Sequence, residues 1–224
     1  MNIQKLKLEK LIKDAVEACA GLGIYVLVDW HILFDHNPNM HTDAALSFFK
    51  KMSAALKEYD NVIYEICNEP NKETTWADIC VYANQVIPVI REEDPDKVII
   101  VGTPVWSQRV DEAAKAPLNY PNLVYTLHFY ADTHRDDLRN LMVQAIADGL
   151  PVFVSEFGIC DASGNGPIND EQTDIWIDLL NKHDISYIIW NLSNKNETSA
   201  ILTPACDKYC GFEDSDFSEC GKRI

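Results

Sequence analysis

The stretch that decides the fold is Val62-Ile63-Tyr64-Glu65-Ile66-Cys67-Asn68-Glu69-Pro70. Its β-branched and aromatic residues predict a strand, and the amide, acid and proline that follow predict an abrupt end. A second stretch, Pro151-Val152-Phe153-Val154-Ser155-Glu156-Phe157-Gly158, has the same design. Each apolar strand delivers one glutamate at its carboxyl end, so the sequence indicates paired-carboxylate chemistry by Glu69 and Glu156.

Four further apolar runs have the length of strands, and they span residues 24–28, 97–101, 123–130 and 186–190. Helical patterns separate the strands, up to about residue 20 and near residues 42–56, 75–92, 109–116, 135–148 and 170–181. Continuous apolar strands that alternate with helices favour a parallel sheet covered on its outer face. A repeat of about 32 residues per strand-helix unit is typical of an eight-stranded α/β barrel. A doubly wound sheet is disfavoured because no G-x-G-x-x-G turn occurs.

Six strand-helix units are expected here, whereas a complete barrel has eight. We therefore predict the α/β class and an incomplete TIM-type barrel of six parallel strands, corresponding to the third to eighth strands of the parent fold. Residues 1–224 would form one partial domain, with a polar, irregular segment at residues 203–224. The strands that begin at Ile24 and end at Trp190 would each have an unpaired apolar edge, which favours a homodimer that covers both edges.

Charge and hydropathy limit the classes of partner. The 224 residues are 47% hydrophobic and carry a formal net charge of −16. This surplus of acid disfavours nucleic acid and anionic membranes, whereas a neutral polysaccharide meets no such objection. No apolar run is long enough to span a membrane, and residues 1–5 lead into a polar helical pattern without the features of a signal peptide.

The seven cysteines are too few and too scattered for a disulfide-built scaffold. Three lie among apolar residues and are expected to be buried free thiols: Cys19, Cys67 and Cys80. Cys206, Cys210 and Cys220 lie in a polar stretch, where a disulfide and free thiols are both open. A metal site there is disfavoured because no histidine lies nearby.

Several strand-end motifs occur together in a characteristic order. Asn68-Glu69-Pro70, His128-Phe129-Tyr130, Ser155-Glu156-Phe157-Gly158 and Trp190-Asn191-Leu192-Ser193 strongly resemble glycoside hydrolase family 5, specifically its bacterial-type endo-β-1,4-glucanases, or cellulases. The resemblance runs from near residue 8 to about residue 202. It includes Val28-Asp29-Trp30-His31, Gly102-Thr103-Pro104-Val105-Trp106-Ser107 and Lys195-Asn196-Glu197.

The resemblance implies a retaining mechanism, with Glu69 as general acid/base and Glu156 as nucleophile. Retaining glycosidases hold the two carboxyl groups about 5 Å apart. Because the two glutamates follow the second and fifth strands of this chain, they would have to face each other across the barrel mouth. No cofactor and no metal are implied.

The resemblance also implies substrate-binding or positioning roles for eight residues: His31, Asn68, Trp106, His128, Tyr130, Trp190, Lys195 and Glu197. Asn68 would bond the sugar 2-hydroxyl, while His128 and Tyr130 would orient the carboxyl groups. Trp106 and Trp190 would stack on glucose rings. Lys195 and Glu197 resemble the polar pair that holds a sugar one subsite further from the cut.

The expected function is therefore endo-acting, retaining hydrolysis of β-1,4-glucan, with a β-glucan polysaccharide or oligosaccharide as partner. Two alternatives remain: a barrel fragment that binds β-glucan without turnover, and a related mannanase or xyloglucanase activity. The first is motivated by the family's nucleophile-binding arginine, which lies on strands that this chain does not contain. Secretion is implied by the resemblance alone.

Other polar and aromatic residues have simpler interpretations. Glu65 lies four residues before Glu69 and nearer the barrel bottom, so a structural role is expected. Trp30 and Trp76 are expected to pack in the core or an interface. His36 and His41 have a spacing that suits neither one helix face nor a zinc site, and we interpret them as solvated loop residues.

Overall fold

The computed structural model describes residues 3–224, with side chains described from residue 7 onward. Residues 1 and 2, part of the stretch interpreted as free of a signal peptide, lie outside the described residues. The chain forms two compact units. The first comprises Met1–Thr126 with Gly149–Pro151, and the second comprises Leu127–Asp148 with Val152–Ile224.

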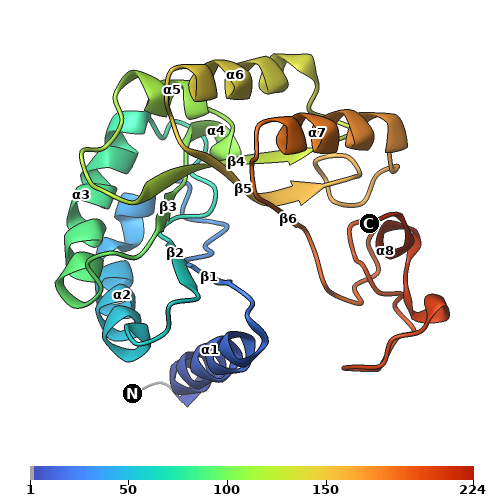
Figure 1. Ribbon diagram of the computed structural model, residues 1–224, viewed down its shortest axis with the longest axis horizontal. Helices are drawn as coiled ribbons and strands as arrows, with labels where there is room; N and C mark the ends of the chain where they lie inside the picture. Colours follow the sequence, from blue (N-terminus) through green and yellow to red (C-terminus); the bar gives the residue numbers. More distant parts are fainter. Residues whose placement is uncertain (1–2) are drawn as a thin grey trace. The chain divides into compact units, whose positions relative to one another are not determined.

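Six strands form one sheet in the order of the chain, β1-β2-β3-β4-β5-β6 (Figure 1). Their bounds are Val26–Asp29, Val62–Glu65, Ile99–Val101, Leu123–Tyr130, Val152–Gly158 and Tyr187–Ile189. Every pairing with a described register is parallel, as in the alignment of Val26 with Val62. The predicted α/β class and the six parallel strands are therefore confirmed.

Helices alternate with the strands, as Figure 1 shows. The longer ones are α1 (Ile3–Leu22), α2 (Thr42–Leu56), α3 (Trp76–Glu93), α6 (Asp136–Ala147) and α7 (Asp170–Lys182). Short helices are η1 (Pro38–His41), α4 (Pro104–Ser107), α5 (Val110–Lys115), η2 (Asp214–Asp216) and α8 (Glu219–Arg223). Among the described residues, no helix combines the length and apolar character that crossing a membrane requires.

The core of the first unit lies between its strands and the helices α2 and α3. Phe49 of α2 meets Tyr64 of β2 edge to face, with ring centroids 6.1 Å apart. The start of α3 is fixed by a capping box, in which Thr75 and Asp78 satisfy each other's backbone N–H groups. Trp76 is buried and donates from Nε1 to the carbonyl of Ala116, 2.9 Å away, so the expected packing role of Trp76 is confirmed.

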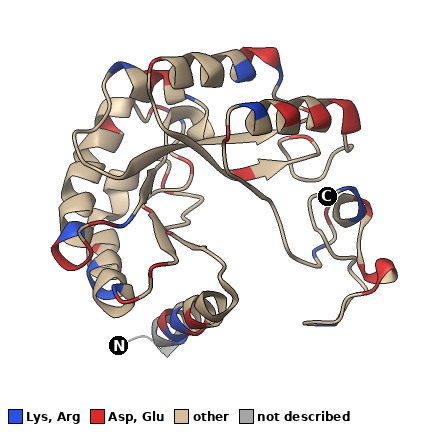
Figure 2. Ribbon diagram, viewed as in Figure 1, with Lys and Arg blue, Asp and Glu red and all other residues tan. Residues whose placement is uncertain are grey.

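The core of the second unit is a stack of aromatic rings. Phe129 of β4 lies 3.9 Å from Trp176 of α7 and 5.3 Å from Phe157 of β5, measured between ring centroids. The indole Nε1 of Trp176 donates to the carbonyl of His134 at 2.8 Å. Figure 2 shows Asp and Glu mainly on helices and connecting loops, so the acidic surplus lies largely outside the strands.

The last segment of the chain, residues 203–224, folds onto the end of the second unit through short elements. An antiparallel bridge joins Leu202 to Phe217, and η2 and α8 lie on either side of Phe217 in the sequence. All seven cysteines are free thiols, so the disulfide left open among Cys206, Cys210 and Cys220 does not form.

Candidate active site

In the first unit, the loop after β2 carries Asn68 and Glu69, and its backbone is held by the loop after β3. Ser107 Oγ donates to the carbonyl of Asn68 at 2.7 Å, and the Trp106 N–H donates to the carbonyl of Pro70 at 2.9 Å. This approach requires a glycine at position 102, because a Cβ there would lie 2.5 Å from the carbonyl oxygen of Cys67.

The supporting loop has an unusual backbone. Three successive residues, Val105, Trp106 and Ser107, have φ values of 58°, 54° and 55°. This left-handed region is unfavourable for a β-branched residue such as Val105, and such strain is concentrated at functional sites. The result is a sharp turn in which Trp106 is 46% exposed, while Ser107 points inward to Asn68.

A second support comes from the loop after β1, and sequence reasoning missed it. The carbonyl of His36 accepts from the Asn71 N–H at 2.8 Å, and Nδ1 of His36 is 2.6 Å from Oδ1 of Asn71. Asn71 in turn donates from Nδ2 to the carbonyl of Glu69 at 3.0 Å. The interpretation of His36 as a solvated residue is therefore wrong, because His36 is half-buried and bonded to Asn71. Local spacing did not indicate this, since the contact joins residues far apart in the chain. His41 is exposed, as expected.

Two predicted site residues of the first unit have informative local surroundings. Asn68 is 4% exposed, and its Nδ2 has no hydrogen-bond partner among the described residues. A buried donor without a partner costs the fold free energy and is suited to bind a ligand oxygen. His31 places Nδ1 2.7 Å from Oδ2 of Asp29, which fixes the orientation of its ring.

Burial raises the pKa of the neighbouring Cys67 thiol far above its usual range. Because only the thiolate is a strong nucleophile, Cys67 is inert and does not compete with the carboxylates. Glu65, 3% exposed within β2, lies in the strand rather than in the loop at its end.

In the second unit, β4 and β5 bring together two predicted residues. The Tyr130 hydroxyl donates to Oε1 of Glu156 at 2.9 Å, and the Glu156 side chain is buried. A hydrogen bond to a carboxylate is charge-assisted, so it orients Glu156 firmly. His128 lies two residues before Tyr130 and therefore on the same face of β4, with Nε2 2.9 Å from Oγ of Ser155.

The position of Tyr130 depends on the absence of a side chain at position 158. A Cβ on Gly158 would lie 2.3 Å and 2.4 Å from two ring carbons of Tyr130, Cδ1 and Cε1. The ring therefore lies directly over the backbone of β5. Sequence reasoning included Gly158 in a motif but assigned it no role, because the requirement appears only when two strands are paired.

The loop after β6 orders the predicted pair Lys195 and Glu197. Oε1 of Glu197 accepts from Asn191 Nδ2 at 3.0 Å and from Ser199 Oγ at 3.2 Å, and it lies 3.9 Å from Lys195 Nζ. Neither Asn191 nor Ser199 was assigned a role from the sequence, although Asn191 lies within the quoted motif at residues 190–193, while Ser199 is a polar residue two positions after Glu197. Trp190 is half-buried at the start of this loop.

Within the second unit the structure thus brings together Tyr130 with Glu156, and Lys195 with Glu197. Asn68 and Glu69 belong to the first unit and Glu156 to the second. The approach of the two glutamates to about 5 Å stays a prediction.

Comparison with known proteins identifies the family. The family described as "Cellulase (glycosyl hydrolase family 5)" matches residues 3–196. Endoglucanase A of Butyrivibrio fibrisolvens is 48% identical over 214 residues, which is 95% of this chain and 49% of that protein. An endoglucanase of Clostridium saccharobutylicum is 47% identical over 97% of this chain and 48% of its own length.

Solved structures agree. The cellulase Cel5C_n is 44% identical with a TM-score of 0.91, covering 97% of this chain and 68% of its own. The catalytic domain of Thermobifida fusca endoglucanase Cel5A, solved with cellotetraose, is 35% identical with a TM-score of 0.92, covering 97% of this chain and 73% of its own. The fold and site thus define a glycoside hydrolase scaffold. The chain belongs to glycosyl hydrolase family 5, and it spans about half the length of the curated relatives it matches.

Proposed function

We propose that this chain carries out retaining, endo-acting hydrolysis of β-1,4-glucan. The observation that carries the proposal is the buried Glu156 carboxylate, oriented by the Tyr130 hydroxyl at the end of a parallel strand in a chain of this family. Active-site groups of α/β barrels project from the carboxyl ends of the strands. Endoglucanases among the relatives, and a neighbour solved with cellotetraose, support a β-glucan as substrate.

The reaction has two balanced steps. In the first, a carboxylate oxygen of Glu156 forms a bond to the anomeric carbon while the glycosidic C–O bond breaks and Glu69 donates its proton to the leaving oxygen. In the second, Glu69 takes a proton from water, the water oxygen attacks the anomeric carbon, and the bond to Glu156 breaks. The two inversions give net retention of configuration.

The unpartnered amide of Asn68 supports a further assignment. Its Nδ2 is a buried donor without a partner, and the oxygen of a sugar 2-hydroxyl would accept a hydrogen bond from it. Hydrogen bonds to the 2-hydroxyl strengthen at the transition state and contribute several kcal/mol. Trp106 and Trp190 would offer apolar faces to the C–H bonds of glucose rings. His31, Lys195 and Glu197 would bind the sugars, and His128 would help to orient the carboxyl groups.

The test is hydrolysis of a soluble β-1,4-glucan by the wild-type chain and by Glu69→Gln and Glu156→Gln. We expect both variants to lose activity and the exposed control Glu73→Gln to keep it. NMR of the first product should show the β-anomer. Activity that survives either site substitution, or an α-anomer formed first, would refute the mechanism.

Azide distinguishes the two roles. With an activated substrate, azide should rescue Glu156→Ala and give an α-glycosyl azide, since it replaces the missing nucleophile. Glu69→Ala with azide should give the β-product, since the glycosyl-enzyme still forms. Hydrolysis of mannan or xyloglucan in the same assay would identify the alternative activities. Binding of cello-oligosaccharides in calorimetry without any hydrolysis would identify a fragment that binds β-glucan without turnover.

A further inference from the structure

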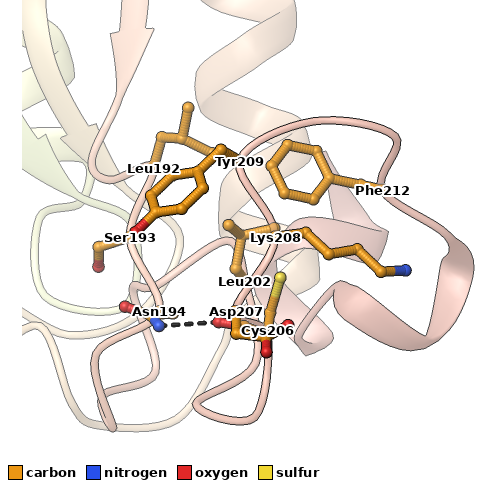
Figure 3. Close-up of a pocket in the computed structure, with 9 residues that line it drawn as sticks. All are labelled: Leu192, Ser193, Asn194, Leu202, Cys206, Asp207, Lys208, Tyr209 and Phe212. Atoms are coloured by element: carbon orange, nitrogen blue, oxygen red, sulfur yellow. Dashed lines mark hydrogen bonds between the residues drawn. The ribbon is translucent and has the colours of Figure 1, made fainter.

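A pocket of about 350 Å³ lies in the second unit, between the loop after β6 and the segment before η2 (Figure 3). One wall is Leu192, Ser193 and Asn194, and the other includes Asp207, Tyr209 and Phe212. Its volume is near the lower end of the range for small-molecule sites, about 300–1,000 Å³. None of these residues has a role in the proposed chemistry.

The pocket has an exposed apolar surface. The Tyr209 side chain is 99% exposed and Leu192 is 70% exposed. Figure 3 shows the rings of Tyr209 and Phe212 on the same side of the pocket. Phe212 also packs edge to face against Phe217, with ring centroids 6.0 Å apart. Exposed apolar side chains gathered at one pocket are a feature of ligand-binding grooves.

The polar groups of the pocket are acceptors with unused capacity. Asn194 donates from Nδ2 to the carbonyl of Cys206 at 2.9 Å, which fixes the amide and leaves Oδ1 for a ligand. Ser193 Oγ has only a long contact of 3.4 Å with the Lys195 N–H. The Asp207 carboxylate has no ion pair among the described side chains, whereas Lys208 is neutralised by Asp216 at 2.7 Å and Glu213 at 3.4 Å.

These contacts select the chemistry of the ligand. With its lysine already paired and its carboxylate unpaired, the pocket disfavours anions. Aromatic rings beside hydroxyl, amide and carboxylate acceptors match a pyranose, which presents C–H bonds on its faces and O–H donors at its edge. The wall formed by residues 206–212 is also pre-organised, because the Lys208–Asp216 ion pair and the Leu202–Phe217 bridge hold this part of the chain in place.

We propose that this pocket is an outer binding site for glucosyl units of a β-glucan chain, with Tyr209 as the stacking surface and Asp207, Ser193 and Asn194 as hydrogen-bond acceptors. The inference rests on the proposed function, because the wall formed by residues 192–194 belongs to the loop that also carries Trp190 and Glu197. A chain longer than the central subsites would reach it. Affinity should therefore increase with chain length until the pocket is filled.

The experiment is calorimetric titration of the Glu156→Gln chain with cellotriose and cellohexaose, with and without Tyr209→Ala or Asp207→Asn. We expect Tyr209→Ala to weaken cellohexaose binding about tenfold, roughly the value of one aromatic contact, and Asp207→Asn to weaken it several-fold. Affinity for cellotriose should change by less than about twofold. The exposed positions Tyr25 and Asp214 supply matched controls, Tyr25→Ala and Asp214→Asn, which should change neither affinity.

Because Tyr209 is fully exposed, its replacement should leave the melting temperature unchanged. Equal loss for both oligosaccharides, or no loss for cellohexaose, would overturn the inference. Hydrolysis by the wild-type chain is measured in parallel. If the wild-type chain hydrolyses β-glucan but Tyr209→Ala leaves cellohexaose affinity unchanged, the outer site is refuted and the proposed function stands. If the wild-type chain does not hydrolyse β-glucan and the Glu156→Gln chain does not bind cello-oligosaccharides, the proposed function itself is refuted.

Discussion

Replacing Gly158 with alanine tests whether the Tyr130 ring orients Glu156. The added Cβ would lie 2.3 Å and 2.4 Å from ring carbons of Tyr130, whereas ordinary contact begins near 3.4 Å. The ring must therefore move by about 1 Å. The hydrogen bond between Tyr130 and Glu156, now 2.9 Å, cannot survive such a displacement without a matching shift of β5.

Two effects of Gly158→Ala can be estimated separately. Loss of a hydrogen bond to a charged group corresponds to about 1.5–3 kcal/mol, so kcat/KM for soluble β-glucan should fall by roughly 10- to 150-fold. Overpacking costs about 1–3 kcal/mol of folding free energy. For a chain of this size, that lowers the melting temperature by roughly 2–12 °C.

The controls separate these effects. Tyr130→Phe removes the hydroxyl and keeps the ring, so it should reproduce the loss of activity with little change in stability. In Gly158→Ala combined with Tyr130→Phe, activity should fall no further than in either single variant. Gly21→Ala, where an added Cβ meets nothing within 4 Å, should leave activity unchanged. Full activity in a destabilised Gly158→Ala chain, or multiplicative losses in the double variant, would refute the reasoning.

Three other predictions follow from the structure. Asn68→Ala should lower kcat/KM about 100-fold but leave the melting temperature within about 3 °C, because the lost Nδ2 has no protein partner; a large loss of stability would contradict this. Hydrogen bonds from Arg109 hold the pKa of Asp111 below its usual range, so the stability they add is present above the unfolded pKa near 4 and is lost as the pH falls through the lower folded pKa. Asp111→Asn should therefore be less stable than wild type at pH 7 by up to about 1 kcal/mol, with the difference shrinking below about pH 4, whereas the exposed control Asp137→Asn should show no such trend in pH-dependent melting. Light scattering at micromolar concentration should show a dimer that pairs the outer strands β1 and β6, and a monomer would count against it.

The sequence was sufficient for features with a local signal. Apolar runs gave all six strands, and periodicity gave α2, α3, α6 and α7 to within a few residues. The prediction that Tyr130 orients a carboxyl group rested on the resemblance carried by the strand-end motifs and their order, and Tyr130 donates to Glu156 from the strand adjacent in the sheet. In each case the information lies within one element or in the order of elements.

Features that depend on close approach had no such signal. Nothing in Pro104-Val105-Trp106-Ser107 indicates three successive left-handed residues, since valine disfavours that region. The network from His36 through Asn71 to Glu69 joins positions far apart in the chain. Gly102 and Gly158 differ from other glycines only in the neighbours that a Cβ would meet. Local propensity carries no information on such contacts, which are set by tertiary packing.

The supports described for the two glutamates differ in a way that fits their proposed roles. Asn71 holds the backbone carbonyl of Glu69, and Ser107 holds that of the preceding residue, so these contacts position the loop. Tyr130 instead holds a carboxylate oxygen of Glu156. A nucleophilic carboxylate must point one oxygen at the anomeric carbon, and a hydrogen bond to its other oxygen fixes that orientation directly. A general acid/base serves first the leaving oxygen and then a water, and a fixed loop backbone keeps its carboxyl group within reach of both. Damage to the Glu69 supports and damage at Tyr130 should therefore each slow both chemical steps, because formation and breakdown of the bond to Glu156 use both glutamates.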